Sequence, residues 1–114
     1  MGAFSSSQQA ASEEDMAEVK KGVEDLIKQN KVVIFSKPTC PYCVDAKRCF
    51  DKLNVKYTAM ELNSHPQGGL VQDILLEMTG ARTVPRVFID GTCIGGGSDT
   101  VALFKSGKLQ KMLE

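Results

Sequence analysis

The sequence predicts an α/β fold in which a four-stranded mixed sheet is flanked by helices, with an extra helix at the N-terminal end. Segments with the two-residue period of strands alternate along the chain with segments of helical period. An early strand–helix–strand succession forms a βαβ unit, whose two strands are parallel because a helix connects them. Further on, Asp90-Gly91 joins two short apolar runs and predicts an antiparallel hairpin. Parallel and antiparallel pairs together make the sheet mixed.

The composition is typical of one globular domain that binds no nucleic acid. The 114 residues are 42% hydrophobic and 25% charged, enough for a modest core. Residues 1–11 are small and polar without periodicity and predict a disordered tail, so the domain spans residues 12–114. With 14 basic and 14 acidic residues the formal net charge is zero, whereas nucleic-acid binders carry a basic excess. No apolar run reaches the ~20 residues of a membrane span, so we expect no stable membrane insertion.

The N-terminal tail carries one short modification motif. Met1-Gly2-Ala3-Phe4-Ser5-Ser6 matches the pattern for N-myristoylation at Gly2. Such short patterns often occur by chance, and a single acyl chain anchors a protein only marginally. The tail shows neither a secretory signal nor the arginines of a mitochondrial transit peptide. We therefore expect a cytoplasmic protein.

The first helix and the first strand have clear signals. Ser12 is placed as an N-cap before three acidic residues, and a helix is predicted over residues 13–29. Its apolar residues recur at helical spacing: Met16, Val19, Val23, Leu26 and Ile27. Residues 31–36 form an apolar, largely β-branched run that predicts a buried strand.

The middle of the chain predicts a helix, a strand and another helix. The first of these helices covers residues 41–53 and has proline at its first position. Less polar and more polar side chains alternate over residues 55–60, which predicts a strand with Val55, Tyr57 and Ala59 on one face. The next helix begins at Pro66 and ends before Gly80, a residue suited to the left-handed conformation there. Its apolar stripe is Leu70, Val71, Ile74, Leu75 and Met78.

The last third of the chain predicts the hairpin and a closing helix. The strands of the hairpin are residues 86–89 and 92–95. Ser98 and Asp99 then cap a helix that runs to about Lys105.

Two cysteines lie between the first strand and the helix that follows it. Cys40 falls at the predicted helix N-terminus, where unpaired backbone N–H groups and the helix dipole favour an anion such as a thiolate. Cys43 lies one turn on, on the same side of the helix and within reach of Cys40. Lys37 adds positive charge nearby. Because thiolates attack disulfides, this pair predicts thiol–disulfide exchange.

The other cysteines do not complete a second site. Cys49 and Cys93 are each isolated and are most simply small core residues, although a regulatory disulfide or a dimer through either stays open. A structural zinc site needs a second closely spaced pair of ligands, and His65 stands alone. We therefore expect no metal.

Three motifs, in this order and spacing, resemble those of a dithiol glutaredoxin: Cys40-Pro41-Tyr42-Cys43, Thr83-Val84-Pro85 and Gly95-Gly96-Gly97-Ser98-Asp99. The resemblance extends from about residue 29 to residue 113, and residues 79–89 are a near-verbatim family segment. It implies a thioredoxin-like fold. The glycine-rich motif is similar to that of second-type animal glutaredoxins, whereas many other members carry a cysteine at the position of Gly97.

The resemblance also implies that the chain uses glutathione, a tripeptide with two carboxylates and one amine, as a co-substrate. By family analogy, Lys37 and Gln72 meet the glycine carboxylate, with Tyr42 and Arg82 alongside. Without the resemblance, Lys37, Gln72 and Arg82 are equally well explained as ordinary solvated residues.

The rest of the tripeptide is assigned in the same way. Val84, between Thr83 and Pro85, pairs its backbone with the cysteinyl segment like an added strand, and Pro85 resembles the cis-proline of the family. The γ-glutamyl carboxylate sits on the helix N–H groups of Ser98 and Asp99, and the Asp99 side chain takes the amine. Gly96 and Gly97 let the backbone come close to the ligand.

The resemblance implies a reaction and its partners. The Cys40 thiolate attacks the glutathione sulfur of a mixed disulfide, and a second glutathione regenerates it. For protein disulfides, Cys43 closes a disulfide with Cys40. The expected partners are glutathione and glutathionylated or disulfide-containing proteins, and the chain is expected to be a monomer.

Two other functions compete with this interpretation. Some glutaredoxins bridge a [2Fe–2S] cluster between two subunits through the first cysteine and glutathione, and act as carriers or sensors. Pro41 argues against a cluster, because family members that hold clusters usually have a small residue such as serine or glycine there, whereas the kinship at Gly97 favours it. A thioredoxin is the second alternative, but Pro41-Tyr42 does not match the residues expected between thioredoxin cysteines.

Overall fold

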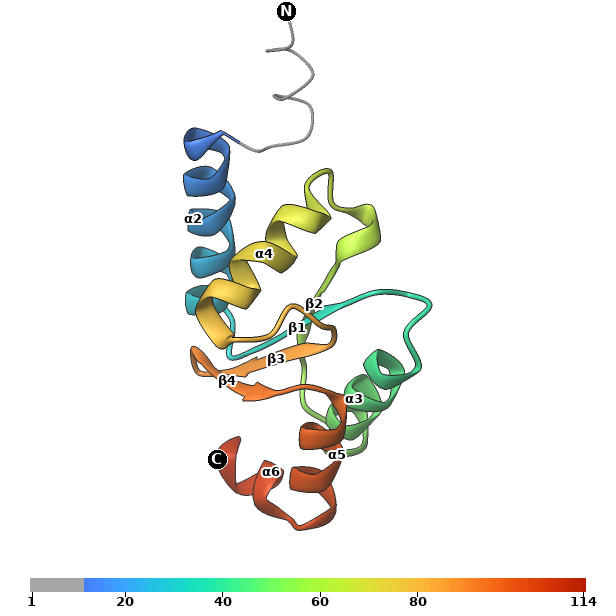
Figure 1. Cartoon of the computed structure of the whole chain (residues 1–114). Helices are drawn as coiled ribbons and strands as arrows, with labels where there is room; N and C mark the ends of the chain where they lie inside the picture. Colours follow the sequence, from blue (N-terminus) through green and yellow to red (C-terminus); the bar gives the residue numbers. More distant parts are fainter. Residues whose placement is uncertain (1–11) are drawn as a thin grey trace, which may run out of the picture.

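The computed structural model describes residues 12–114, so the predicted tail over residues 1–11 and the modification at Gly2 lie outside the described residues. The helices and strands follow the predicted order (Figure 1). The helices are α2 (Glu13–Gln29), α3 (Pro41–Lys52), α4 (Gly68–Thr79), α5 (Gly97–Lys105) and α6 (Lys108–Met112), with a 3-10 turn, η1 (Leu62–Ser64). The strands are β1 (Val32–Ser36), β2 (Thr58–Glu61), β3 (Arg86–Ile89) and β4 (Thr92–Gly95).

The four strands form one mixed sheet, as predicted. Their order across the sheet is β2-β1-β3-β4. β1 runs parallel to β2, with Val33 opposite Thr58, and antiparallel to β3, with Val33 opposite Phe88. β3 and β4 are the two arms of the predicted antiparallel hairpin.

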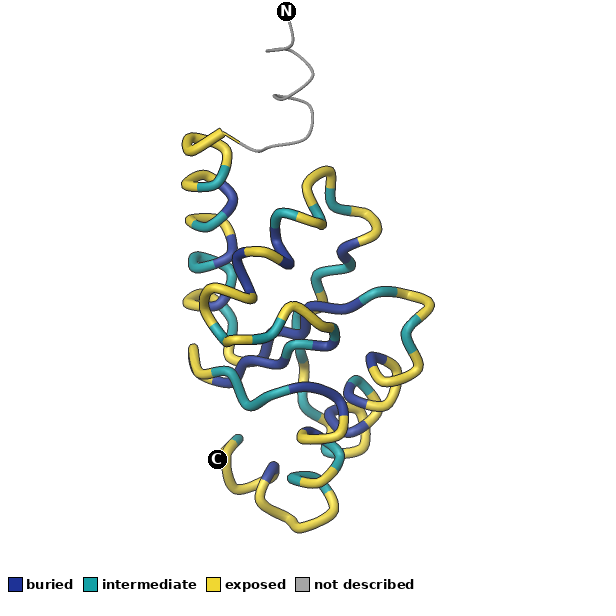
Figure 2. Tube along the Cα trace, viewed as in Figure 1, coloured by how far each residue is buried: buried dark blue, intermediate teal, exposed yellow. Residues whose placement is uncertain are grey.

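Helices cover both faces of this sheet, and β1 is buried along its whole length (Figure 2). We call the two core clusters the α2/α4 core and the α3/α5 core. Buried residues of the α2/α4 core are Val19, Val23, Ile27, Val33, Phe35, Leu62, Val71, Ile74, Leu75 and Phe88. Those of the α3/α5 core are Val32, Ile34, Ala46, Cys49, Phe50, Val87, Ile89 and Leu109. Alternate residues of β1 and β3 thus point to opposite cores, as the two-residue period of strands requires.

Strand direction brings three distant segments of the chain together. β3 is antiparallel to β1, and β4 is antiparallel to β3. The end of β1, the start of β3 and the end of β4 therefore lie at the same edge of the sheet. The loop with the cysteine pair follows β1, the Thr83-Val84-Pro85 segment precedes β3, and the glycine-rich segment follows β4. The three motifs of the sequence meet at this edge.

The second strand is shifted from the prediction over residues 55–60. β2 begins at Thr58, and no residue before it pairs with β1. Tyr57 is half-buried and packs against the α3/α5 core instead. β2 lies at the edge of the sheet, and Ala59 on it is exposed.

The helix predicted from Pro66 begins two residues later, at Gly68. The chain first forms the turn η1, which no periodic pattern signals. The end of the helix is as predicted: Gly80 adopts a left-handed conformation with φ 83°, and its N–H donates to the carbonyl of Leu76.

The last long helix was expected to be capped by Ser98 and Asp99, and this expectation is wrong in detail. Its N-cap is Gly96, and Gly97 is already helical. The Asp99 carboxylate accepts a hydrogen bond from the Gly96 N–H at 2.9 Å, so it still closes the first turn from inside the helix. Among residues 12–114, no helix is long and apolar enough to cross a membrane.

Candidate functional site

Cys40 is the N-cap residue of α3. Its backbone is extended, Pro41 occupies the first helical position, and its Sγ accepts a hydrogen bond from the Cys43 N–H at 3.3 Å. The N–H groups of a helix's first turn carry partial positive charge and no intrahelical partner. The structure therefore places this sulfur at the helix N-terminus, at the position that the sequence predicts.

Cys43 lies beneath Cys40 and is completely buried. Burial, together with the hydrogen bond to Cys40, raises the pKa of the Cys43 thiol to about 12. Both cysteines are free thiols in the structure, as are Cys49 and Cys93. The two cysteines therefore differ in exposure: Cys40 is half-buried, whereas Cys43 is completely buried behind it and its thiol is protonated at neutral pH.

This asymmetry predicts a difference in alkylation. In a Cys40→Ser variant, we expect iodoacetamide to leave Cys43 unmodified at pH 7 and to label it only at higher pH, because thiolates react and burial, the largest cause of the raised Cys43 pKa, is retained. Peptide mass spectrometry across the pH range measures the labelling. Full labelling of Cys43 at neutral pH in folded protein would contradict the asymmetry.

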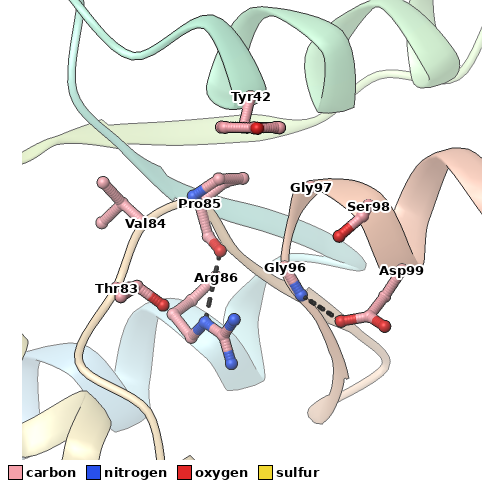
Figure 3. Close-up of a pocket in the computed structure, with 9 residues that line it drawn as sticks. All are labelled: Tyr42, Thr83, Val84, Pro85, Arg86, Gly96, Gly97, Ser98 and Asp99. Atoms are coloured by element: carbon pink, nitrogen blue, oxygen red, sulfur yellow. Dashed lines mark hydrogen bonds between the residues drawn. The ribbon is translucent and has the colours of Figure 1, made fainter.

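A cleft of about 320 Å³ lies beside the cysteine pair, where the three motifs meet (Figure 3). Its lining comes from the first turn of α3, from the segment that leads into β3, and from the start of α5. The lining residues are Tyr42, Thr83, Val84, Pro85, Arg86, Gly96, Gly97, Ser98 and Asp99. Tyr42 is 62% exposed, so its ring is accessible to a molecule bound in the cleft.

The Val84–Pro85 peptide bond is cis, as the resemblance implies. The Val84 carbonyl lies 3.7 Å from the Cys40 Sγ, which donates to it as a thiol. Val84 precedes β3 and lies outside the ladder with β1. Its backbone is therefore placed beside the sulfur, where an extended peptide can pair with it.

The start of α5 forms the other wall of the cleft. The first intrahelical bond runs from Thr100 N–H to the Gly96 carbonyl, so the N–H groups of Gly97, Ser98 and Asp99 have no intrahelical partner. Such a helix N-terminus attracts carboxylates. The backbone of Gly97 passes close to Tyr42: a Cβ added to Gly97 would lie 2.8 Å from the Cβ of Tyr42.

Three predicted site residues do not line the cleft. Gln72 is only 8% exposed, and its Nε2 donates to the carbonyl of Arg82 at 3.1 Å. The Arg82 guanidinium pairs instead with Asp73 on α4, with Nε 2.9 Å from the carboxylate. Lys37 lies in the turn before Cys40 and accepts the Cys40 N–H at its carbonyl. Binding roles for these three residues stay predictions, since none of them lines the cleft.

One lining residue, Arg86, was missed in the sequence. It directly follows Pro85 and opens β3, and its Nε donates to the Pro85 carbonyl at 3.2 Å. Strand alternation places Arg86 on the same side of β3 as Phe88, which lies in the α2/α4 core, so no local pattern in the sequence assigns Arg86 to the cleft.

The remaining chemistry of the described residues is sparse. No group of three or more histidine, cysteine, aspartate or glutamate side chains within residues 12–114 is placed to hold a metal ion. Cys49 is buried in the α3/α5 core and Cys93 packs against the α2/α4 core, as expected of small core residues.

The sequence matches known proteins over most of its length. A model of the glutaredoxin family matches residues 32–94. "Glutaredoxin-2, mitochondrial" of Homo sapiens is 51% identical over 87 residues, which are 76% of this chain and 53% of the relative. The glutaredoxin of Ricinus communis is 44% identical over 90 residues, 79% of this chain and 88% of the relative. The chain thus spans about half the length of the mammalian relatives it matches.

Solved structures show the same fold. The buckwheat glutaredoxin–glutathione complex is 39% identical, with a TM-score of 0.86 over 90% of this chain and 93% of that one. Oxidized glutaredoxin 2 from Chlamydomonas reinhardtii is 43% identical, with a TM-score of 0.83 over 86% of this chain and 92% of that one. The family match, the shared thioredoxin-like fold and the meeting of the three motifs at one cleft lead to one conclusion: this chain belongs to the glutaredoxin family.

Proposed function

We propose that this protein reduces protein–glutathione mixed disulfides and protein disulfides, with glutathione as its reductant. The observation that carries the proposal is the position of Cys40, a half-buried sulfur on a helix N-terminus beside a cleft lined by Val84 and by the start of α5. The glutathione complex of the buckwheat relative supports the choice of co-substrate.

The chemistry of each turnover balances without an external cofactor. The Cys40 thiolate attacks the glutathione sulfur of a mixed disulfide, forms a Cys40–glutathione disulfide and releases the protein thiolate, which takes a proton. A second glutathione thiolate then attacks the bound glutathione sulfur, releasing oxidised glutathione and restoring Cys40. One mixed disulfide and one reduced glutathione thus become one thiol and one oxidised glutathione.

The cleft has groups suited to each part of the tripeptide. The Val84 backbone suits the cysteinyl segment, whose sulfur must reach Cys40. The N–H groups at the start of α5 suit a carboxylate, and one oxygen of Asp99 remains for an amine, since the other accepts from Gly96. Tyr42, which also lines the cleft, is placed to cover the part of the tripeptide between Val84 and the start of α5.

Cys43 serves a second class of substrate. When Cys40 is bonded to a protein sulfur, Cys43 displaces that protein by closing the Cys40–Cys43 disulfide. Its burial directly behind Cys40 supports this role. Because its thiol is protonated at neutral pH, the step needs loss of a proton as the new bond forms.

A Cys43→Ser variant tests this division of labour. We expect it to retain reduction of glutathione mixed disulfides, which needs only Cys40, and to lose most reduction of a protein with an intramolecular disulfide. A coupled assay that follows oxidised glutathione measures the first reaction, and insulin precipitation measures the second. Equal loss of both activities would contradict the assigned roles.

We also propose that the protein is a monomer without a resident metal cluster. Pro41 at the first position of α3 supports this, because glutaredoxins that hold a [2Fe–2S] cluster usually have a small residue there. We expect protein purified without oxygen to be colourless and to elute as a monomer on gel filtration. A brown dimer that loses its colour when glutathione is removed would support the cluster-bridged alternative. The cytoplasmic location stays a prediction, since the mammalian relatives are named as mitochondrial.

A further inference from the structure

The arginine at the start of β3 is held in place by the backbone next to it. Arg86 lines the cleft, is half-buried, and donates from Nε to the Pro85 carbonyl at 3.2 Å (Figure 3). This contact uses one of the five guanidinium N–H groups and leaves the terminal nitrogens for other acceptors. The side chain is thereby anchored in the cleft wall.

This guanidinium has no acidic partner among residues 12–114. The ion pairs of that part of the chain join Lys20 to Glu77, Lys21 to Asp25, Lys31 to Asp90, Lys47 to Glu61 and Arg82 to Asp73. Arg82, only four residues away, is more exposed and is nevertheless paired. A partly buried charge without a partner is costly, and the cost is recovered when an anion enters.

The guanidinium also lies next to the helix N-terminus that forms the other wall. A Cβ added to Gly96, the N-cap of α5, would lie 2.7 Å from Arg86 Nη2. Arg86 and the N–H groups at the start of α5 thus converge on one end of the cleft, and Tyr42 lies on the other side of Pro85 from Arg86 in Figure 3. A planar guanidinium beside convergent N–H groups matches the two oxygens of a carboxylate.

We propose that Arg86 is a specificity-determining residue that binds the γ-glutamyl carboxylate of glutathione together with the N-terminus of α5. The inference rests on the proposed function and goes beyond it by naming the group that distinguishes glutathione from other thiols. The start of α5 offers N–H groups for a carboxylate and a remaining Asp99 oxygen for an amine, and the γ-glutamyl end is the only end of the tripeptide that carries both groups. Its carboxylate then neutralises the unpaired guanidinium.

Two disulfide substrates and matched arginine variants test this role. One substrate joins glutathione to a chromophoric aromatic thiol, and the other is identical except that 4-aminobutyrate replaces the γ-glutamyl residue, which removes only its carboxylate. The protein carries Cys43→Ser, so that each reaction stops at the Cys40 mixed disulfide. Release of the chromophore gives the second-order rate constant. Arg86→Met is compared with Arg82→Met, which removes the same charge from the same segment.

We expect Arg86→Met to lower the rate constant for the glutathione disulfide by about tenfold, the range for loss of a charge-assisted hydrogen bond at a partly exposed site. The rate constant for the analogue should change by less than about twofold. Arg82→Met should leave the ratio of the two rate constants at its wild-type value. Arg86→Lys should restore part of the preference for the glutathione disulfide that Arg86→Met loses.

Two results would overturn the inference. One is an equal loss for both substrates in folded Arg86→Met protein, which marks a merely structural role. The other is a wild-type protein that reacts equally with both disulfides. Glutathione-dependent turnover of wild-type protein in the coupled assay reports separately on the proposed function, so the two failures are distinguishable.

Discussion

Replacement of Cys40 by serine is expected to lower glutathione-dependent reduction of a mixed disulfide by a factor on the order of 10³ or more. The serine hydroxyl keeps the size of the side chain and its place at the N-cap of α3. It is not ionised at neutral pH and forms no disulfide, so the first step of the reaction is lost entirely. The coupled assay with glutathione and a small mixed disulfide measures this loss.

Cys93→Ser is the matched control for this substitution. Cys93 lies on β4, is half-buried and does not line the cleft. We expect this variant to keep the wild-type rate within about twofold, as is usual for substitutions away from special features. A Cys40→Ser protein that is folded and still turns over at the wild-type rate would refute the assignment of the nucleophile.

Truncation of Leu75 to alanine is expected to destabilise the protein by about 2–5 kcal/mol. Leu75 is completely buried in the α2/α4 core, where α4 packs on α2 and on the sheet. Removing its side chain forfeits burial of apolar surface and leaves a cavity that the core fills only partly. Urea unfolding measures the change, read as a shift in midpoint at constant slope.

The adjacent residue on α4 provides the control. Leu76 is 46% exposed, and Leu76→Ala makes the same chemical change in the same helix. Since alanine and leucine have similar helix propensities, we expect a change within about 0.5 kcal/mol. Equal destabilisation by the two substitutions would show that the packing of α4 differs from that described.

Local signals in the sequence predicted most of the fold. The helix from residue 13 to residue 29 has the predicted bounds, and Ser12 caps it by accepting the Asp15 N–H at 3.0 Å. The hairpin around Asp90-Gly91 also has the predicted strands. Each signal depends on residues next to one another in the chain, so a sequence read without neighbours in space can find it.

Errors arose where tertiary contacts decide the outcome. Strand alternation continues from residue 55, but pairing with β1 begins only at Thr58, because the ring of Tyr57 packs near Phe50, with 6.2 Å between ring centroids. The N-cap of α5 is Gly96 rather than Ser98, and Gly97 begins the helix close to Tyr42, a residue distant in the sequence. No local pattern reports such packing.

The candidate site was predictable as a set of motifs but not as a set of side-chain directions. The three motifs do meet at one cleft, because strand order brings their loops to one edge of the sheet. An ion pair outside the motifs distinguishes the two arginines. Arg82 pairs with Asp73 on α4, whereas Arg86 lines the cleft. A resemblance assigns residues by position in the chain and does not include this competition.

The central claim is that the Cys40 sulfur carries glutathione during turnover, and capture of that intermediate tests it most directly. Reduced Cys43→Ser protein is mixed with a glutathionylated protein, quenched with acid and digested for peptide mass spectrometry. We predict one glutathione per chain, attached to Cys40 in the peptide that contains Tyr42. Glutathione found only on Cys49 or Cys93, or on no cysteine of the folded protein, would contradict the claim.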